Sequence, residues 1–263
     1  MLVLYHSGLT TCSKQVRHCL REKQLAYESR YVDLLRFEHL SPDYLKLNPN
    51  GVVPTLVHDG RVIVNSACIN EYIEEAFPEP RLSPTDLTER ARMRLWVWTA
   101  DDSHPQGARL TRNRRLKAAV SELQPAELQL VLERMPVPGR RERWQRQAQG
   151  GHSDDEIATA IEHFRFVTAR MEQELATRGP WLAGETFSLG DISMTSLIHR
   201  VFELFPETLP RSSHPNLNDW FERIMARPSA KLVYTAGTDE TPKLPPGRSV
   251  SGITEFRIEM ATR

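Results

Sequence analysis

A short run of hydroxyl and thiol side chains, Thr10-Thr11-Cys12-Ser13, stands where a first helix is expected to begin. The apolar run from Leu2 to His6 predicts a buried strand, and the helix that follows is expected to open near Ser13. A hydroxyl at a helix N-terminus can donate a charge-assisted hydrogen bond to an anion, in a place where the helix dipole also favours negative charge. N-capping is the commoner reason for a serine at such a place, so Ser13 has two interpretations.

The chain has three cysteines, and one of them stands in the same reactive run. Cys12 directly precedes the expected helix start, where an exposed thiol has a lowered pKa; its other interpretation is a small apolar filler. Cys19 and Cys68 fall on apolar helix faces and are expected in the core. An odd, sparse set of cysteines argues against a disulfide framework and for a reducing compartment. No zinc-type spacing of cysteine and histidine occurs, so we predict no metal site.

Composition limits the classes of protein to be considered. The chain has 263 residues, of which 40% are hydrophobic, and 34 Lys+Arg balance 34 Asp+Glu. That length suffices for a sizeable core in one large or two small domains, and the charge balance gives no case for binding nucleic acid or a membrane surface. No apolar run of the length that spans a bilayer occurs, and the first residues, MLVLYHSGLT, lack the features of a secretory signal. We therefore expect a soluble, cytoplasmic protein.

The first eighty residues predict a mixed sheet with helices packed on it. The segment AYESRYVDL alternates like a strand, and Ser41-Pro42 is typical of a helix start. Two short strands on either side of Asp59-Gly60 predict a two-residue hairpin. Ser66 begins a helix whose apolar face consists of Ile69, Tyr72, Ile73 and Phe77. His6 is expected to be a polar strand end without a partner.

Beyond a proline-rich linker at 79–87 the sequence predicts only helices. One is expected over 153–175, where apolar residues step by three and four, and another ends at Arg227-Pro228. Ser188-Leu189-Gly190-Asp191 resembles a capping box that Phe187 can staple. We divide the chain into an α/β domain (1–80), an all-helical domain (88–236) and an irregular tail (237–263).

An α/β half followed by an all-helical half resembles the glutathione transferase fold, in which the first domain is thioredoxin-like. NPNGVVPTL resembles the family's turn into a cis-proline, and NSACINEYIEEAFP resembles the segment that holds the γ-glutamyl end of glutathione. FSLGDISMT and WFERIMARPSAKL resemble the helix-capping motif and the last helix of the second domain. FEHLSPDYLKLNPNGVVPTLVHDG looks most like the theta-type branch, and MPVPGRRERWQRQAQGG is similar to an insertion in bacterial glutathione-dependent β-etherases and in tetrachlorohydroquinone-dehalogenase-like proteins.

The resemblance implies that glutathione is a co-substrate and that the protein stabilises its thiolate. A cysteine-type thiol titrates near about pH 8.5, so the thiolate needs stabilisation at neutral pH. The resemblance favours Ser13 as the hydroxyl for this task, with Thr10 and Thr11 as alternatives if the loop register is shifted. In omega-like and beta-like transferases a cysteine near the position of Cys12 forms a mixed disulfide with glutathione, so Cys12 competes with Ser13.

The remaining glutathione contacts are carried over by position. Val53 is expected to pair its backbone with the cysteinyl part, because cis-Pro54 exposes that backbone. Ser66 is expected to bind the γ-glutamyl carboxylate at a helix start, and His39 to meet the glycyl carboxylate, although a lone histidine is more often a surface residue. Asn65 departs from the acidic residue that usually pairs with the ammonium group, so we expect weakened glutathione affinity that Asn65→Glu restores.

The electrophile is expected between the two domains, over the helix face that carries Trp96, Ala100 and His104. Aromatic residues at helical spacing are more often core, which is the other interpretation of Trp96. Two basic runs are typical of solvated helix faces, but they could also create a field for an acidic aromatic substrate or a partner. They consist of Arg109, Arg112, Arg114, Arg115 and Lys117, and of Arg140, Arg141, Arg143 and Arg146.

The resemblance thus implies a homodimeric glutathione transferase whose bound thiolate attacks an electrophilic carbon of an aromatic small molecule. In the β-etherase version that carbon bears an aryl ether, and a phenolate leaves. Two other readings stay open: glutathione-dependent thiol–disulfide chemistry at Cys12, and a non-catalytic ligand carrier with the transferase fold. None of the three requires a metal.

Overall fold

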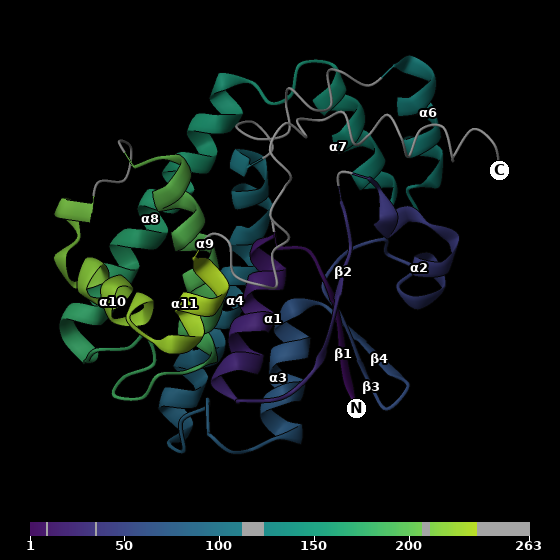
Figure 1. The fold of residues 1–263 in the computed structure, drawn as a ribbon. Coiled ribbons are helices and arrows are strands. Elements are labelled where there is room, and N and C mark those ends of the chain that lie inside the picture. The colour runs from purple at the N-terminus through teal and green to yellow at the C-terminus, as the bar shows by residue number, and fades with distance from the viewer. Residues whose placement is uncertain (9, 35, 112–123, 207–210, 236–263) are drawn as a thin grey trace.

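The sheet of the molecule is mixed, as the sequence predicts. The computed structural model describes residues 1–8, 10–34, 36–111, 124–206 and 211–235. Its strands follow the order β2-β1-β3-β4; β1 pairs parallel with β2 and antiparallel with β3, and β3 pairs antiparallel with β4 (Figure 1). Their bounds are β1 Leu2–His6, β2 Glu28–Tyr31, β3 Thr55–His58 and β4 Arg61–Val64. Asp59 and Gly60 join β3 to β4 with φ of 48° and 80°, as a two-residue hairpin requires.

Helices cover both faces of this sheet. One face carries α1 and α3, and the other carries η1 and α2 (Figure 1). Their bounds are α1 Thr11–Glu22, α3 Ser66–Ala76, η1 Glu38–Leu40 and α2 Pro42–Leu47. Ser41 caps α2, and the Tyr44 hydroxyl donates to the Val52 carbonyl oxygen at 2.6 Å. That bond holds α2 against the loop leading to the Val53-Pro54 peptide, which is cis as predicted.

In the rest of the described chain the regular elements are helices, and an isolated bridge pairs Trp181 with Gly184. Ser153 and Glu156 form a capping box at the start of α8, so the predicted helix there is confirmed. The helix expected to end at Arg227-Pro228 is α10, which ends at Met225, and Pro228 begins α11 at a first helical position, where proline is tolerated. The bounds are α4 Leu87–Thr111, α6 Pro125–Arg134, α7 Pro138–Ala148, α8 Asp154–Arg178, α9 Leu189–Leu204, η3 Arg211–Ser213, α10 Pro215–Met225 and α11 Pro228–Tyr234.

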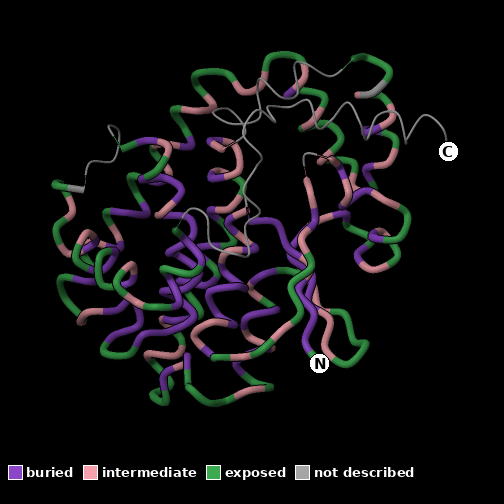
Figure 2. Tube along the Cα trace, in the orientation of Figure 1, coloured by how far each residue is buried: buried purple, intermediate pink, exposed green. Residues whose placement is uncertain are grey.

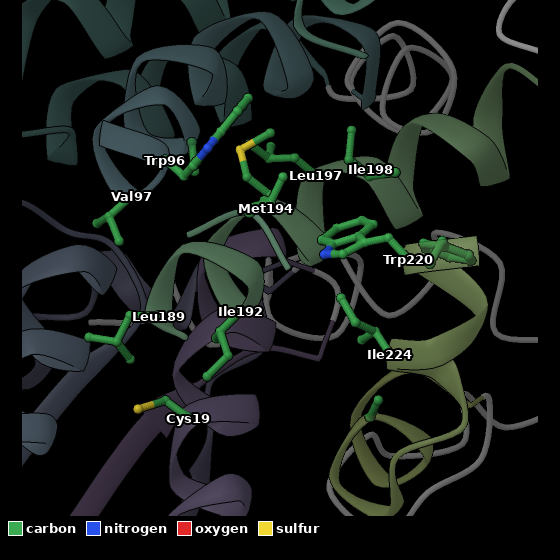
Figure 3. Packing of buried hydrophobic residues seen from close by; sticks show 14 of the residues in the cluster. Cys19, Trp96, Val97, Leu189, Ile192, Met194, Leu197, Ile198, Trp220 and Ile224 are labelled. Carbon is green, nitrogen blue, oxygen red and sulfur yellow. The ribbon is translucent and has the colours of Figure 1, made fainter. Parts of the chain in front are cut away.

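The core is built around α9, which packs against α1 and α4 (Figure 3). Ile192, Leu197 and Trp220 belong to this cluster and are almost completely buried. A Cβ on Gly190 would lie 3.2 Å from the Met93 carbonyl oxygen, so glycine allows α9 to approach α4 closely. Buried residues gather around β1, α1 and α9, whereas α6 and α7 are mostly exposed or half-buried (Figure 2).

The predicted capping box of α9 is confirmed, and its aspartate does more than cap. Asp191 is fully buried and accepts hydrogen bonds on both carboxylate oxygens. Oδ1 accepts from the Leu182 N–H at 3.0 Å and from the Trp220 indole N–H at 2.8 Å. Oδ2 accepts from the Ser188 N–H at 2.9 Å and from the Ser188 hydroxyl at 3.0 Å. The side chain therefore links the start of α9 to α10 and to the loop before α9.

Polar contacts tie α1 to the helical part of the chain. The Gln15 side-chain amide donates to the Ser193 carbonyl oxygen at 3.1 Å. At the other end of α1, Arg227 donates two hydrogen bonds of 2.7 Å to the Glu22 carboxylate, and the Ser229 hydroxyl donates a third. Burial alone would raise the pKa of Glu22, but these bonds and a nearby His18 hold that pKa well below its usual range.

Two expectations about single residues are wrong. Cys68 is exposed, because it lies on the outer side of α3 while Ile69 and Ile73 face the core. His6 is buried rather than being an unpartnered strand end, and its Nε2 lies 2.7 Å from the Ser29 hydroxyl oxygen. Cys19 is buried in the core as expected.

Some expectations fall outside the described residues, namely the tail at 237–263 and the basic residues Arg112, Arg114, Arg115 and Lys117. Across the part of the chain that is described, no helix combines the length and apolar character needed to cross a membrane.

Candidate functional site

The first helix begins two residues earlier than predicted, which changes the hydroxyl at its N-terminus. Thr10 is the N-cap, and its Oγ1 accepts the Ser13 N–H at 3.2 Å. Ser13 is not the cap: it lies within the first turn and is completely buried. The Ser13 Oγ lies 2.7 Å from the Thr10 Oγ1 and accepts the Ser7 N–H at 3.2 Å. Thr10 is therefore the half-buried hydroxyl at the helix end, with Ser13 directly behind it. Thr11 is buried.

Cys12 is half-buried beside groups from two other helices. Burial acts to raise the pKa of its thiol, but the neighbouring His104 on α4 and the Ser66 hydroxyl on α3 lower it, and the net direction is downward. Asp101, also on α4, opposes them. The thiol thus stands where the starts of α1 and α3 meet α4. Cysteine in such surroundings is more nucleophilic at neutral pH than a free thiol.

The start of α3 has the groups expected of a carboxylate-binding helix end. Asn65 is the N-cap, with φ of 71°, and its Oδ1 accepts the N–H groups of Ala67 and Cys68 at 2.9 and 3.2 Å. Ser66 follows and is buried. The side-chain amide of Asn65 lies 3.5 Å from the carboxylate of Asp101. Asp101 therefore places a negative charge beside Asn65, and sequence reasoning missed it because the two residues lie on different helices.

The cis-proline turn leaves backbone groups available. Val53 is buried and precedes β3, and its backbone N–H and C=O have no hydrogen-bond partner among the described residues. Backbone polar groups at such a position are normally paired with protein, water or a ligand. An extended peptide laid beside Val53 could satisfy both groups in the manner of an added strand.

His39 is buried rather than on the surface, and it does not carry charge at neutral pH. Burial, assisted by the nearby Arg140 guanidinium, lowers the pKa of His39 to about 4. Its Nδ1 has no hydrogen-bond partner in the described part of the chain. Arg140 comes from α7 and donates to the Asn50 carbonyl oxygen at 3.2 Å. One residue of the second basic run therefore lies against the first eighty residues instead of on a solvated face.

The three residues expected to line an electrophile pocket differ in their exposure. Trp96 is 2% exposed and Ala100 is 1% exposed, so both are core residues. Figure 3 shows Trp96 among the buried side chains near Met194 and Leu197. His104 is half-buried, and its side chain lies beside the Cys12 thiol. Of the three expected residues, His104 is the one that lies beside Cys12 in the described structure. Within the described residues no cluster of three His, Cys, Asp or Glu side chains could hold a metal ion.

Comparisons with known proteins agree with this geometry. The family described as "Glutathione S-transferase, N-terminal domain" matches residues 4–81, and "Glutathione S-transferase, C-terminal domain" matches residues 152–228. Protein LigF of Sphingobium sp. is 30% identical over 240 residues, which cover 89% of this chain and 93% of LigF. The tetrachloro-p-hydroquinone reductive dehalogenase of Sphingobium chlorophenolicum is 28% identical, over 86% of this chain and 92% of that protein.

Solved structures also match this chain. The crystal structure of the β-etherase LigF matches with a TM-score of 0.83 and 29% identity, covering 89% of this chain and 98% of that one. A theta class glutathione S-transferase from Xanthomonas axonopodis pv. citri, solved with glutathione bound, matches with a TM-score of 0.68 and 25% identity, covering 90% and 98%. The thioredoxin-like domain and the helical domain predicted from the sequence are confirmed. The chain belongs to the glutathione S-transferase family and is an enzyme of the glutathione transferase type.

Proposed function

We propose that this enzyme cleaves aryl ethers by attack of the glutathione thiolate on the carbon that bears the aryloxy group. The observation that carries the proposal is the similarity to the β-etherase LigF, which covers 89% of this chain in sequence and in structure. In this proposal residues 1–80 bind glutathione and residues 88–236 bind a hydrophobic aromatic electrophile. The enzyme acts in the cytoplasm, without nucleic acid, membrane or metal.

Glutathione lies along the cis-proline turn in this proposal. Its cysteinyl backbone pairs with the unpartnered N–H and C=O of Val53, beside cis-Pro54. Its γ-glutamyl carboxylate binds Ser66 at the N-terminus of α3, where the helix dipole favours an anion. These two contacts place the sulfur near Thr10 and Cys12, because Ser66 itself adjoins the Cys12 thiol.

Thr10 donates the hydrogen bond that stabilises the thiolate. It is the hydroxyl at the N-cap, whereas Ser13 is buried behind it and bonded to it. Hydroxyl protons rotate, so Ser13 can donate to the Thr10 Oγ1 while Thr10 donates to sulfur. The thiolate then attacks the ether-bearing carbon: a C–S bond forms and the C–O bond breaks. The aryloxide leaves with the bonding electrons and takes a proton from solvent.

Asn65 stands where the family usually has an acidic residue, and in this proposal Asp101 supplies the negative charge instead. Asp101→Asn is therefore expected to weaken glutathione binding about threefold to fivefold. The carboxylate stands beside Asn65, where the ammonium group of the γ-glutamyl end would lie. Isothermal titration calorimetry with glutathione measures the change, and Asp102→Asn, an exposed neighbour on α4, serves as the control. Asn65→Glu is expected to tighten binding; an unchanged affinity in both Asp101→Asn and Asn65→Glu contradicts this account.

A second candidate function is thiol–disulfide exchange at Cys12, favoured by the half-buried thiol beside His104 and Ser66. The Cys12 thiolate would attack a glutathione mixed disulfide, forming a Cys12–glutathione disulfide and releasing the other thiolate. A second glutathione thiolate would then attack that disulfide, yielding oxidised glutathione and free Cys12. The reductive dehalogenase among the similar proteins is named for a reaction that also consumes reducing equivalents.

One experiment separates the two functions. Wild type and Cys12→Ser are incubated with glutathione and an aryl ether that bears the ether on a benzylic-ketone side chain, and products are identified by mass spectrometry. The proposal expects one phenol and one glutathione thioether per turnover from both proteins. In a parallel incubation with glutathione and a mixed disulfide of glutathione, formation of oxidised glutathione that is lost in Cys12→Ser supports the exchange reaction instead. Absence of both products, despite glutathione binding, contradicts aryl-ether cleavage.

We also propose that the enzyme is a homodimer that pairs through α4 and α8. Leu95 and Trp98 on α4 and Phe166 on α8 are large apolar side chains that stay 44%, 63% and 62% exposed in one chain. Exposed apolar patches of this kind mark protein interfaces. Sedimentation velocity is expected to give the mass of two chains, and Trp98→Glu to give one; a monomeric wild type contradicts the dimer.

A further inference from the structure

The segment α6–α7 covers the side of the sheet domain where the glutathione backbone ends. It lies between the two family matches, which end at residue 81 and resume at 152. Val131, Leu132 and Met135 pack on Phe37 and Leu40 of the segment before α2. The Trp144 ring meets the Phe37 ring edge-on, with centroids 5.5 Å apart. In Figure 1, α6 and α7 accordingly stand above α2 and the end of β2.

Arg140 is the charged residue that this packing brings inward. It is half-buried in the first turn of α7, and its only hydrogen bond among the described residues goes to the Asn50 carbonyl oxygen. No carboxylate of the described chain pairs with it. Burial and the neighbouring Arg143 lower the pKa of Arg140, and the Cys12 thiolate acts in the opposite direction, yet a guanidinium remains protonated in proteins. A half-buried cation without an anion is costly, so this place favours an anionic ligand.

Two buried polar side chains also lack partners: His39, which interacts with Arg140, and Gln147, which lies about two turns further along α7. His39 is 8% exposed and its Nδ1 has no hydrogen-bond partner in the described residues. Gln147 is 3% exposed, and both atoms of its side-chain amide are unpaired within the same residues. Arg140, Trp144 and Gln147 are spaced by four and three, so they share the face of α7 that Trp144 turns toward Phe37. Buried polar atoms normally have partners, so these point to a ligand.

The proposed course of glutathione leads its last residue to this place. With the γ-glutamyl end at Ser66 and the cysteinyl part at Val53, the glycyl residue continues toward Asn50 on the far side of the turn. A residue in an extended peptide spans about 3.4 Å, so the glycyl carboxylate ends within a residue or two of Val53. Asn50 lies three residues before Val53, next to that interval, and its carbonyl oxygen accepts the hydrogen bond of Arg140.

We propose that Arg140 binds the glycyl carboxylate of glutathione, with neutral His39 as a second hydrogen-bonding group beside it. The inference rests on the proposed function, because it takes glutathione as the ligand and Ser66 and Val53 as its other contacts. It assigns the positive charge of the glycyl subsite to the helical segment between the two family matches rather than to His39. In this arrangement the α6–α7 segment covers the glycyl end of glutathione.

The test compares glutathione with glutathione monoethyl ester, in which the glycyl carboxylate is blocked. Binding of both is measured by isothermal titration calorimetry for wild type, Arg140→Met, Arg140→Lys and the exposed control Arg143→Met. Wild type is expected to bind glutathione about tenfold more tightly than the ester, since a charged hydrogen bond is lost with the ester. In Arg140→Met this preference disappears while the affinity for the ester stays unchanged; Arg140→Lys keeps part of the preference, and Arg143→Met keeps all of it.

The unchanged ester affinity separates loss of a contact from loss of folding. If Arg140→Met weakens both ligands equally, Arg140 is structural and the inference is overturned. If wild type binds both ligands equally, the glycyl carboxylate makes no contact that contributes to affinity, and the inference is likewise overturned, although the proposed function stands. If wild type binds neither ligand, the proposed function fails, and the inference fails with it.

Discussion

Thr10→Val is expected to lower kcat/KM for glutathione conjugation about a hundredfold, the usual effect of removing one hydrogen-bond donor from a reacting anion. Valine matches threonine in shape but cannot donate from the helix N-cap to the sulfur. The same change is expected to raise the pKa of bound glutathione toward that of the free thiol. Ultraviolet difference spectroscopy follows the thiolate from acid to alkaline pH and measures that pKa directly.

Three variants control this prediction. Thr10→Ser keeps a hydroxyl at the N-cap and is expected to keep most of the activity. Ser13→Ala removes only the hydroxyl behind Thr10, which lies 2.7 Å from it, and is expected to have an intermediate effect. Loss of the cap costs about 1 kcal/mol of stability, so folding of Thr10→Val is checked by circular dichroism. If Ser13→Ala abolishes activity while Thr10→Val retains it, the serine contacts the thiolate itself and Thr10 is only a cap.

Asp191→Ala is expected to lower the free energy of unfolding by about 3–5 kcal/mol, the range for breaking a buried charged network. The substitution removes the acceptor of four hydrogen bonds and leaves buried donors on Leu182, Ser188 and Trp220 unpaired. A loss of that size is a large part of the 5–15 kcal/mol typical of a folded protein, so the variant will be poorly folded at 37 °C.

Urea unfolding followed by tryptophan fluorescence measures the effect. Asp219→Ala serves as the matched control, because Asp219 is exposed on α10, one residue before Trp220. It is expected to change stability by less than about 0.5 kcal/mol. Asp191→Asn is expected to remain strongly destabilised, since an amide presents a donor where the carboxylate accepts. A loss below about 1 kcal/mol in Asp191→Ala would contradict the structural role assigned to the network.

Much of the fold follows from local signals in the sequence. The Asp59-Gly60 hairpin, the Ser41-Pro42 helix start and the capping boxes at Ser153 and Ser188 are each decided by a few neighbouring residues. Such signals have one low-energy solution, so the sequence predicts them correctly. The cis peptide bond before Pro54 is predicted instead from the family resemblance, because a proline alone does not determine its isomer.

The site was harder to predict because its geometry depends on contacts between distant segments. Three neighbouring hydroxyl side chains, Thr10, Thr11 and Ser13, could cap α1. The choice among them depends on where the helix begins, which the local pattern defines only to within a residue or two. Helical spacing puts Trp96 and His104 on one face of α4, about two turns apart, but only the packing of α9 decides that Trp96 is core. Arg140 looked like one residue of a solvated run, although its spacing from Trp144 and Gln147 could have indicated an inward face.

The anchoring of α1 has a consequence for how the enzyme opens. Its far end is held by Glu22, Arg227 and Ser229, and its middle by Gln15 and the core, so the end that carries Thr10 and Cys12 cannot loosen without breaking the main core. The α6–α7 segment rests on a much smaller apolar cluster and therefore has a lower free energy of local opening. We therefore expect larger fluctuations of the native state in the α6–α7 segment than at the N-terminal end of α1. In the proposed function, exchange of glutathione would then involve local opening of α6–α7, whereas Thr10 and Cys12 belong to the more stable part of the molecule.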